Sequence, residues 1–385
     1  MSLLMMSPMA RGQTTSPEMD AAKRIQANVL GVDAHNDTVQ RILIENVDIG
    51  RRLTDGTVDL PRLREGGMHV PFFALWVPSY YHGAEAVRRT LDLRDAMQRV
   101  FDKYPDQIEL ATGAHDVERI VGEKKIAVVL TVEGGHQIDD DLAVLRMYRR
   151  MGILSMTLTH FRNNNWADSS TTPPVHNGLT EFGKQVVREM NAIGMMVDIS
   201  HVSDKTFYDV LEVTTKPVIA SHSSCFVNSA VPRNMKDDMF RALAKNGGVV
   251  GVNFGSSFLS AKDAEALKKR IAQANTEEPN LTGAELDTFA AKDMLDLGDT
   301  HPKIGAATVE DAAECIDHIA RIAGIDHVGI GSDFDGINSV PQGLEDVSKM
   351  PALTAALLKR GYKEQDIRKI MGGNFLRVMR EVVGN

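Results

Sequence analysis

The chain has 385 residues, of which 43% are hydrophobic and 25% charged, and its 43 Lys and Arg against 52 Asp and Glu give a net charge of −9. This composition is ordinary for a globular protein with a sizeable core and excludes an intrinsically disordered chain. The acidic balance and the lack of a basic stripe argue against a nucleic-acid partner, because neutralising phosphates requires clustered Lys and Arg. No window approaches ~18 consecutive apolar residues, so we expect no segment that spans a membrane.

The N-terminal stretch MSLLMMSPMARGQTTSPEMD holds a short apolar run followed by small and polar residues. It is typical of a disordered tail, a cloning scar or the remnant of a secretory signal, so we exclude residues 1–22 from the fold. The remaining residues 23–385 are expected to form one domain. The compartment stays open: cytoplasmic, or periplasmic or secreted if the stretch is a signal remnant.

The chain contains only two cysteines, Cys225 and Cys315. Two cysteines are too few for a disulfide framework, and their spacing matches no zinc motif. We therefore expect both side chains to be buried thiols.

Eight short apolar runs, rich in β-branched residues, alternate along the chain with segments of helical period. The runs cover residues 29–37, 68–77, 126–135, 153–160, 195–201, 217–223, 248–255 and 327–336. Between them, residues 179–194 show an apolar helical stripe that ends at Gly194, and a second stripe runs from Thr308, a candidate N-cap, to Gly324. Eight strands that alternate with helices predict an α/β fold, a (β/α)8 TIM barrel, with a doubly wound sheet as the alternative.

A barrel of this length must carry insertions, because ~250 residues are typical of the fold. The longest is the polar stretch 256–304, between the seventh and eighth strands, which is far longer than a usual connection and suits a helical lid over the site. The stretch 48–65, before the second strand, is the other candidate.

Most of the apolar runs end in the same way, with a metal-capable or ionisable residue just after their last hydrophobic residue. These residues are His35, Asp37, Glu133, His160, His201, His222 and Asp333. A lone His or Asp at a strand end is more often a structural or capping residue. All strand C-termini of a barrel open on one face, however, so seven such residues together predict a functional site there.

The spacing of these residues suggests two cation sites. His35 and Asp37 are two apart and point to the same side of an extended strand, so both can chelate one cation. His201 and His222 can bind a second cation, and the glycines after Glu133 leave its carboxylate free to bridge. Imidazoles and carboxylates without a thiolate suit two Zn²⁺ ions, with Mn²⁺, Co²⁺ or Fe²⁺ possible. Two such metals would hold a bridging hydroxide and polarise a carbonyl, as metal-assisted hydrolysis requires.

Nine motifs lie along most of the chain in one order and spacing: VDAHNDT, TVEGGHQ, LRMYRRMGILSMTLTH, NNNWADSS, DISHVSD, ASHSS, PRNMKDD, HVGIGSDFDG and IMGGNFLRV. In these motifs the sequence resembles the renal (membrane) dipeptidase family of zinc metallopeptidases, within the amidohydrolase-like barrels. The resemblance implies that His35 and Asp37 take one metal, that His201 and His222 take the other, and that Glu133 bridges them. Relatives that bridge through a carboxylated lysine open instead with HxH, whereas this chain has HND.

The resemblance also implies roles for residues that handle the substrate. His160 would donate to the developing oxyanion, and Arg233 would clamp the free C-terminal carboxylate of the substrate. Asp333 would take the proton from the bridging water and pass it to the leaving amine. It stands nearer the strand end than Asp335, which is the less favoured candidate.

Two polar residues near these positions have alternative interpretations. Arg233 could instead pair with Asp237 or Asp238 in its own loop. Asn253, in the glycine-rich run GGVVGVNFG, could reach the mouth of the pocket. That run lacks the spacing of a phosphate-binding loop and is typical of a tight barrel strand.

These features together predict a binuclear zinc dipeptidase that hydrolyses L,L dipeptides and, by the family resemblance, L,D dipeptides. One alternative is a related amidohydrolase that acts on N-acyl amino acids or lactones. A second is a metal-containing binding protein without turnover, against which the presence of His160 and Asp333 argues. The resemblance further implies a homodimer, and the polar end MREVVGN indicates a bacterial-type relative without a lipid-anchor signal.

Overall fold

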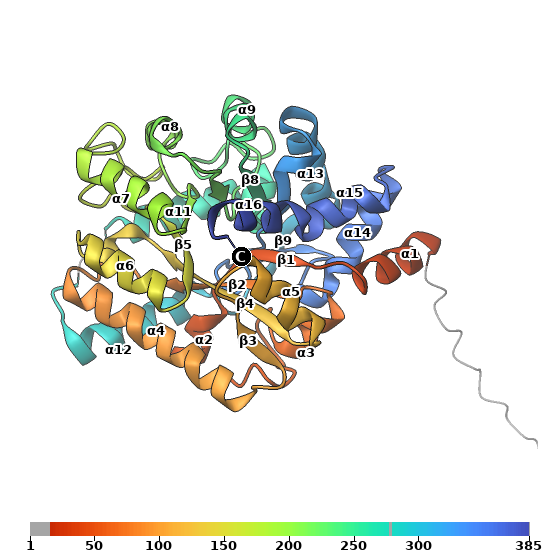
Figure 1. Cartoon of the computed structure of the whole chain (residues 1–385), viewed down its shortest axis with the longest axis horizontal. Coiled ribbons are helices and arrows are strands. Elements are labelled where there is room, and N and C mark those ends of the chain that lie inside the picture. Colours follow the sequence, from red (N-terminus) through yellow and green to blue (C-terminus); the bar gives the residue numbers. More distant parts are fainter. Residues whose placement is uncertain (1–15, 277–278, 385) are drawn as a thin grey trace, which may run out of the picture.

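The computed structural model describes residues 16–276 and 279–384. Its centre is a parallel sheet of eight successive strands, which Figure 1 shows inside a ring of helices. The strands are β1 (Val32–Asn36), β2 (Val70–Trp76), β4 (Ile126–Glu133), β5 (Ile153–Thr157), β6 (Met196–Asp198), β7 (Ile219–Ala220), β8 (Val249–Val252) and β10 (Val328–Ile330). A bridge between Asn36 and Phe334 brings the last strand back to the first, so the sheet nearly closes into a barrel. The predicted fold class is confirmed, and each strand lies inside its predicted apolar run.

The helices between the strands follow the predicted βα alternation. Around the barrel they are α2 (Thr38–Ile44), α3 (Leu60–Glu65), α4 (Ala84–Lys103), α5 (Ala114–Gly122), α6 (Leu142–Arg150), α7 (Glu181–Ala192), α8 (Asp204–Val213), α9 (Asp237–Asn246) and α13 (Val309–Ala323), followed by α14 (Met350–Lys359), α15 (Glu364–Arg368) and α16 (Asn374–Val382). As predicted, Thr308 is the N-cap of α13, in a capping box with Asp311. Gly194 follows α7 with a φ of 67°, a conformation that favours glycine.

The amino-terminal end of the barrel is filled by apolar side chains. Helix α16 packs against this end, and Figure 1 shows it crossing the strands near the centre of the ring. The buried cluster includes Val32, Val70, Phe72, Val129, Leu154, Met196, Ile219, Val249, Phe375 and Met379. Because this end is plugged, the polar side chains at the opposite ends of the strands are the ones that a ligand can reach.

The long insertion is helical, as predicted. It forms α10 (Ser256–Leu259), α11 (Ala264–Ala274) and α12 (Gly283–Leu297), and the chain then enters β9 (Lys303–Thr308). Strand β9 pairs with β11 (Ser339–Gln342) in a small separate sheet that the sequence did not predict. A further strand, β3 (Ile108–Leu110), pairs with the edge of β4.

Helix α1 (Pro17–Gln26) begins inside the range that the sequence assigns to a tail. Its Ala22 and Ile25 side chains are buried, and the helix packs against α14. The tail prediction is therefore wrong for residues 17–22. Residues 1–15 lie outside the described residues.

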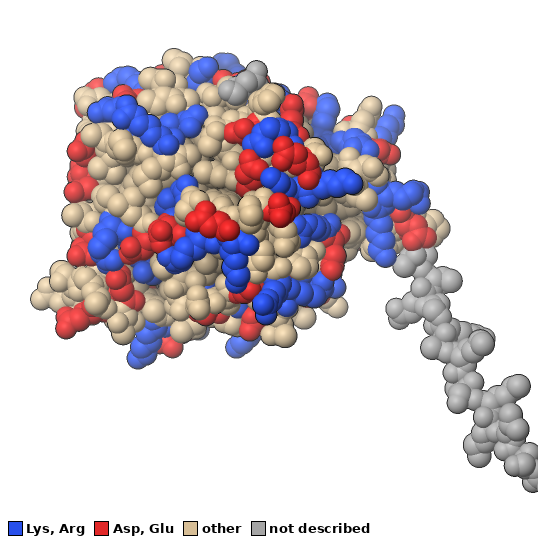
Figure 2. All heavy atoms as spheres, turned by 60° about the horizontal axis from the view of Figure 1, so that its bottom comes forward, with Lys and Arg blue, Asp and Glu red and all other residues tan. Residues whose placement is uncertain are grey.

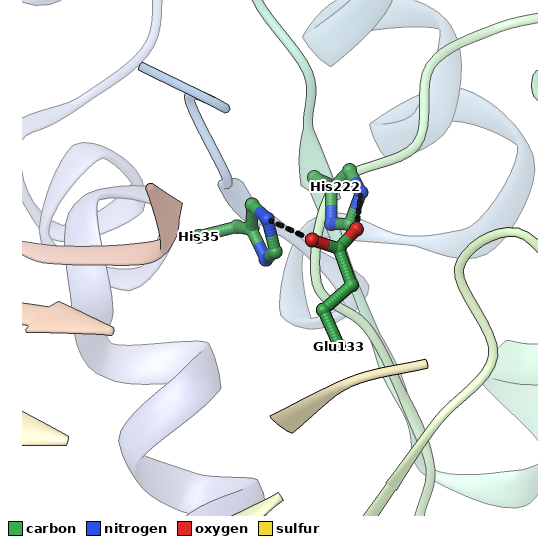
Figure 3. A group of neighbouring side chains, drawn as sticks. All are labelled: His35, Glu133 and His222. Atoms are coloured by element: carbon green, nitrogen blue, oxygen red, sulfur yellow. Dashed lines mark ion pairs between the residues drawn. The ribbon is translucent and has the colours of Figure 1, made fainter. Parts of the chain in front are cut away.

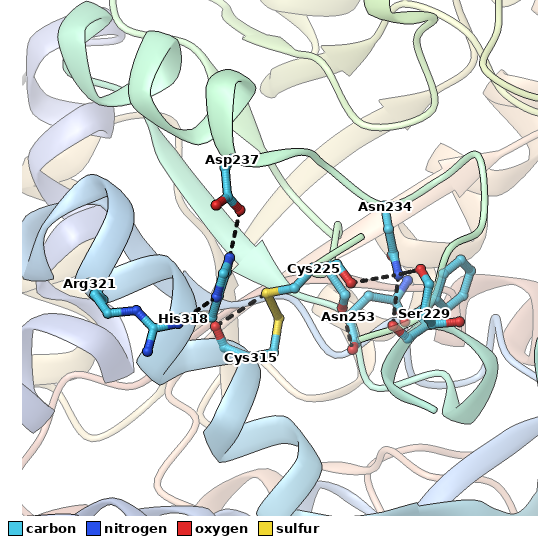
Figure 4. The surroundings of a disulfide bond; sticks show 10 residues. Cys225, Ser229, Asn234, Asp237, Asn253, Cys315, His318 and Arg321 are labelled. Atoms are coloured by element: carbon cyan, nitrogen blue, oxygen red, sulfur yellow. Dashed lines mark hydrogen bonds and ion pairs between the residues drawn. A yellow bond between two sulfur atoms is a disulfide. The ribbon is translucent and has the colours of Figure 1, made fainter. Parts of the chain in front are cut away.

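The prediction of two thiols is also wrong, because Cys225 and Cys315 form a disulfide (Figure 4). Cys225 lies in the loop after β7, and Cys315 lies on α13. The two residues are 90 positions apart in the sequence, yet their Cα atoms are 5.8 Å apart. Their spacing could not reveal the pair, since only the packing of this loop against α13 brings them together.

Charges of both signs are mixed on the surface. On the face in Figure 2, Lys and Arg side chains lie among Asp and Glu side chains. Ion pairs between partly exposed side chains include Arg119 with Glu109 and Arg146 with Glu189. Among the described residues, no helix combines the length and apolar character that crossing a bilayer requires.

Candidate metal centre and active site

The predicted site residues meet at the carboxyl ends of the barrel strands. His35 lies near the end of β1, Glu133 is the last residue of β4, and His222 follows β7. Figure 3 shows these three side chains pointing toward one another from separate elements. His160 and His201 reach the same place from the loops after β5 and β6. All five are buried.

The two carboxylate oxygens of Glu133 face different imidazoles. Its Oε1 atom is 3.0 Å from Nε2 of His201 and 3.3 Å from Nε2 of His222. Its Oε2 atom is 3.4 Å from Nε2 of His35, and His160 Nε2 is 3.9 Å from Oε1. Oε2 thus faces His35 while Oε1 faces the other three imidazoles, which is the arrangement that a bridging ligand needs.

Two further carboxylates, those of Asp37 and Asp333, lie near the His35 ring. Its Nε2 atom is 3.3 Å from Asp37 Oδ2 and 4.0 Å from Asp333 Oδ1. Three groups of side chains could each hold a metal ion, because the ligand atoms within each group lie within 4.8 Å of one another. The first group is His35, Glu133 and His222, the second is Glu133, His160 and His201, and the third is His35, Asp37 and Asp333. Asp333, which the resemblance implies as a proton carrier, therefore also lies within reach of the cation that His35 and Asp37 would hold.

The chemistry of the cluster fits divalent cations. Burial lowers the pKa values of His201 and His222, so both rings are in the neutral form that binds metals. Their Nε2 atoms are 2.9 Å apart. His35 Nε2 and Asp37 Oδ1 are buried without a hydrogen-bond partner. Buried polar atoms that converge in this way without partners are costly unless a ligand occupies the space between them.

Neighbouring residues hold His222 in a ligating orientation. Its Nδ1 atom is 2.7 Å from the Ser221 hydroxyl, which donates to Asp198 at 2.5 Å. Because that hydroxyl donates its hydrogen to Asp198, it can only accept from the ring. His222 therefore donates Nδ1–H to Ser221 and directs the Nε2 lone pair into the cluster. Such outer contacts fix the tautomer of metal-ligating histidines.

The two aspartates of the SDFDG motif have different environments. Asp335 accepts hydrogen bonds from the Thr57 amide at 2.8 Å, the Thr57 hydroxyl at 2.7 Å and the Thr38 hydroxyl at 2.8 Å. Asp333 accepts one side-chain hydrogen bond, from Asn253 at 2.7 Å, and turns its other oxygen toward His35. Burial raises the pKa of Asp333 to about 6. Asp335 is thus held by the stretch before β2, whereas Asp333 faces the cluster.

Arg233 lies in the site and does not pair with the acids of its own loop. Its Nη2 atom donates to the carbonyl oxygen of His222 at 3.0 Å, and its guanidinium lies 5.7 Å from the ring centre of Phe258. Asp237 and Asp238 bond instead to a histidine of α13 and a tyrosine of α8. Arg233 Nε is buried without a partner, and burial lowers the pKa of the guanidinium to about 10. It therefore offers a positive charge to an anion in the cavity.

These groups surround a cavity at the carboxyl ends of the strands. It is lined by Asp37, Gln40, Trp76, Glu133, His160, Phe161, His201, Arg233, Phe258, Arg270, Met294, Asp299, Asp333, Asp335, Gly336 and Ile337. His160 packs between aromatic rings, 4.4 Å from that of Phe161 and 5.2 Å from that of Trp76. Burial lowers the pKa of His160, so the ring is neutral and can donate one hydrogen bond.

Four of the lining residues belong to the insertion 256–304 and were not singled out from the sequence: Phe258, Arg270, Met294 and Asp299. The insertion therefore contributes to the wall of the cavity, and its role as a lid stays a prediction. No motif marks these residues, because none of them lies directly at the end of a barrel strand. Only the folding of the insertion over the barrel brings them to the cavity.

Comparison with known proteins agrees with this site. The sequence profile of the membrane dipeptidase family (peptidase family M19) matches residues 19–384. The dipeptidase tcpJ of Claviceps purpurea is 37% identical over 338 residues, which cover 85% of this chain and 69% of that protein. A dipeptidase of Schizosaccharomyces pombe, named as uncharacterized, is 36% identical over 372 residues, covering 91% of this chain and 80% of that protein.

Solved structures share the fold over almost the whole chain. The probable dipeptidase PvdM of Pseudomonas aeruginosa has a TM-score of 0.78 and 26% identity, covering 95% of this chain and 98% of that one. A metallopeptidase of Rhodobacter sphaeroides, solved with a phosphinate mimic of the dipeptide L-Ala-D-Ala, has a TM-score of 0.76 and 25% identity, covering 92% and 99%. With its barrel, its buried cluster of metal-capable side chains and these relatives, the chain belongs to the membrane dipeptidase family and is a metallopeptidase of the dipeptidase type.

Proposed function

We propose that this chain is a binuclear zinc dipeptidase. His35 and Asp37 would hold one ion, His201 and His222 the other, and Glu133 would bridge them. The observation that carries this proposal is the placement of the Glu133 carboxylate, with one oxygen 3.0 Å from His201 and the other 3.4 Å from His35. Bound there, two zinc ions would polarise the scissile carbonyl and make a water molecule nucleophilic at neutral pH.

The substrate would be bound and oriented by groups on the cavity wall. Arg233 pairs with the α-carboxylate of the dipeptide, for which its buried guanidinium has the matching charge and fork. His160, kept neutral by burial, donates a hydrogen bond to the carbonyl oxygen as negative charge develops on it. Its ring is held between Trp76 and Phe161, so the donor is oriented before the substrate arrives.

Asp333 carries the proton in this proposal. Its pKa of about 6 lies near neutrality, so it can take a proton from the attacking water and pass it to the amine of the departing residue. Asn253 holds the Oδ2 atom at 2.7 Å and thereby keeps Oδ1 directed at the cluster. Asp335 supports the loop without taking part.

We further propose that L,D dipeptides are substrates, supported by the relative that binds a mimic of L-Ala-D-Ala. The rival substrates are N-acyl amino acids and lactones. A panel of L-Ala-L-Ala, L-Ala-D-Ala, N-acetyl-L-alanine and an acyl homoserine lactone, assayed by release of amino acid or acid, separates them. We expect both dipeptides to be hydrolysed at least about 10-fold faster in kcat/KM than the others. Faster turnover of the acylated compounds or the lactone would overturn the proposal.

A homodimer is also proposed, from the family resemblance alone. Light scattering of the eluted protein tests it directly, with twice the chain mass expected.

A further inference from the structure

The insertion adds a charged pair to the cavity. Arg270, on α11, forms an ion pair through Nη2 with Oδ2 of Asp299, which lies just beyond α12. Arg270 also lies with its guanidinium 5.4 Å from the ring centre of Phe161, and its Nη1 donates weakly to the carbonyl oxygen of Gly336 at 3.4 Å. The pair therefore joins the insertion to the rim of the barrel, and both of its members line the cavity.

Five carboxylates of the described residues line this cavity: Asp37, Glu133, Asp299, Asp333 and Asp335. Asp37, Glu133 and Asp333 belong to the metal-capable groups. Asp335 is occupied by three hydrogen bonds from two threonines. Asp299 is the carboxylate that the proposed mechanism leaves without a role.

One oxygen of Asp299 lacks a partner. The residue is 6% exposed, and its Oδ1 atom is buried with no hydrogen-bond donor. Burial raises the pKa of this carboxyl to about 7, against the opposing effect of Arg270. A buried acceptor without a donor costs free energy in the folded protein, roughly 1–3 kcal/mol. A cationic donor from a bound molecule would remove this cost.

A dipeptide is a zwitterion, and the cavity offers one charged group for each of its ends. Arg233 supplies the positive charge for the α-carboxylate in the proposed function. Outside the metal-capable groups, Asp299 supplies the negative charge that suits an α-ammonium group. We propose that Oδ1 of Asp299 accepts the α-ammonium group of the substrate, and that Arg270 is a positioning residue that holds Asp299 through Oδ2.

This inference rests on the proposed dipeptidase function and deepens it. It implies that the insertion is the part of the chain that recognises the amino group of the substrate. A substrate with an acylated or missing amino group would leave Asp299 Oδ1 unpaired and would be rejected, because a site built to hydrogen-bond a polar group discriminates strongly against analogues without it. The inference thus gives a physical reason for preferring dipeptides over N-acyl amino acids.

The test compares two substrates that differ only in the amino group, L-Ala-L-Ala and propionyl-L-alanine. Asp299→Asn should lower kcat/KM for L-Ala-L-Ala by about 10²-fold and change that for propionyl-L-alanine by less than about 3-fold. The matched control is Asp296→Asn, since Asp296 is an exposed aspartate of α12 in the same insertion. The control should match the wild type on both substrates.

Three results would overturn the inference. The first is an equal loss on both substrates, which would mean that Asp299 only holds the insertion in place. The second is an unchanged kcat/KM for L-Ala-L-Ala in Asp299→Asn. The third is a wild-type kcat/KM for L-Ala-L-Ala that exceeds that for propionyl-L-alanine by less than about 10-fold. This result does not depend on whether the variant folds.

The same experiment separates this inference from the proposed function. If the wild-type enzyme hydrolyses L-Ala-L-Ala faster than propionyl-L-alanine but one of these three results is found, only the role of Asp299 fails. If the wild-type enzyme releases no alanine from L-Ala-L-Ala or other dipeptides, the proposed function fails and this inference fails with it. Arg270→Met tests the positioning role of Arg270. It should reduce the preference for L-Ala-L-Ala over propionyl-L-alanine, as Asp299→Asn does, but by a smaller factor.

Discussion

The Oε1 atom of Glu133 lies 3.0 Å from Nε2 of His201, although the two residues belong to different βα units of the barrel. The other oxygen of the same carboxylate faces His35 on the first strand. One side chain thus contacts both halves of the cluster, and the expectations below depend on this geometry.

Replacing Glu133 should disrupt both proposed cation sites together. Glu133→Gln keeps the size of the side chain but removes the charge that would be shared between two cations. We expect metal content to fall and kcat/KM for dipeptides to drop by at least about 10²-fold. Elemental analysis of the purified variant, with an activity assay, checks this. Full metal content with near-normal activity would contradict a bridging role.

Asp333 and Asp335 form a natural matched pair of variants. Asp333→Asn should lower kcat by about 10² to 10⁴-fold while both metals stay bound, because the variant cannot carry the proton. Loss of one metal instead would show that Asp333 is a ligand, as its 4.0 Å approach to His35 allows. Near-normal activity with both metals would exclude the proton-carrying role.

Asp335→Asn should affect stability more than catalysis. The variant weakens three hydrogen bonds that tie the loop after β10 to Thr38 and Thr57. We expect the free energy of unfolding to fall by about 1–3 kcal/mol, with kcat changed far less than in Asp333→Asn. Urea unfolding measures the first quantity and steady-state kinetics the second. A kcat loss equal to that of Asp333→Asn would reverse the assignment of the two aspartates.

Arg233→Ala should act mainly on substrate binding. Removing the guanidinium should raise KM for dipeptides by about 10 to 10²-fold, the equivalent of roughly 1.5–3 kcal/mol for a charged hydrogen bond. Dipeptide amides lack the carboxylate and should be affected much less. An equal loss on dipeptides and on their C-terminal amides would contradict the carboxylate clamp.

The disulfide between Cys225 and Cys315 should contribute to stability. It closes a stretch of 90 residues, and such a link lowers the entropy of the unfolded chain. We expect reduction, or the Cys225→Ser and Cys315→Ser double substitution, to lower the free energy of unfolding by about 2–5 kcal/mol. Denaturant unfolding with and without reductant measures this, and the double variant should be insensitive to reductant. A reductant effect of the same size in the double variant would place the cause elsewhere.

The barrel could be predicted from the sequence because its strands are buried on both faces and read as continuous apolar runs. The residues at the strand ends could be predicted for the same reason: once the strands are located, the topology places His35, Glu133 and His222 on one face. Each of these residues is marked by its position near the end of an apolar run. Their convergence follows from the fold alone.

The insertion and the disulfide depend on contacts that have no local signature. Asp299 and Arg270 are 29 positions apart in a polar stretch where charged residues are common, and only tertiary packing brings them together. Cys225 and Cys315 likewise meet through the packing of a loop on a helix. Helix α1 was missed because its sequence is short and polar, and its stability comes from packing against α14.

The most direct test of the central claim is the metal content per chain, measured together with activity. The purified protein is analysed for metals, stripped with a chelator, and titrated with Zn²⁺ while the hydrolysis of L-Ala-L-Ala is followed. The account predicts two zinc ions per chain, loss of activity on stripping, and full recovery near two equivalents. Full activity in the stripped protein, or complete recovery at one equivalent, would contradict a two-metal site bridged by Glu133.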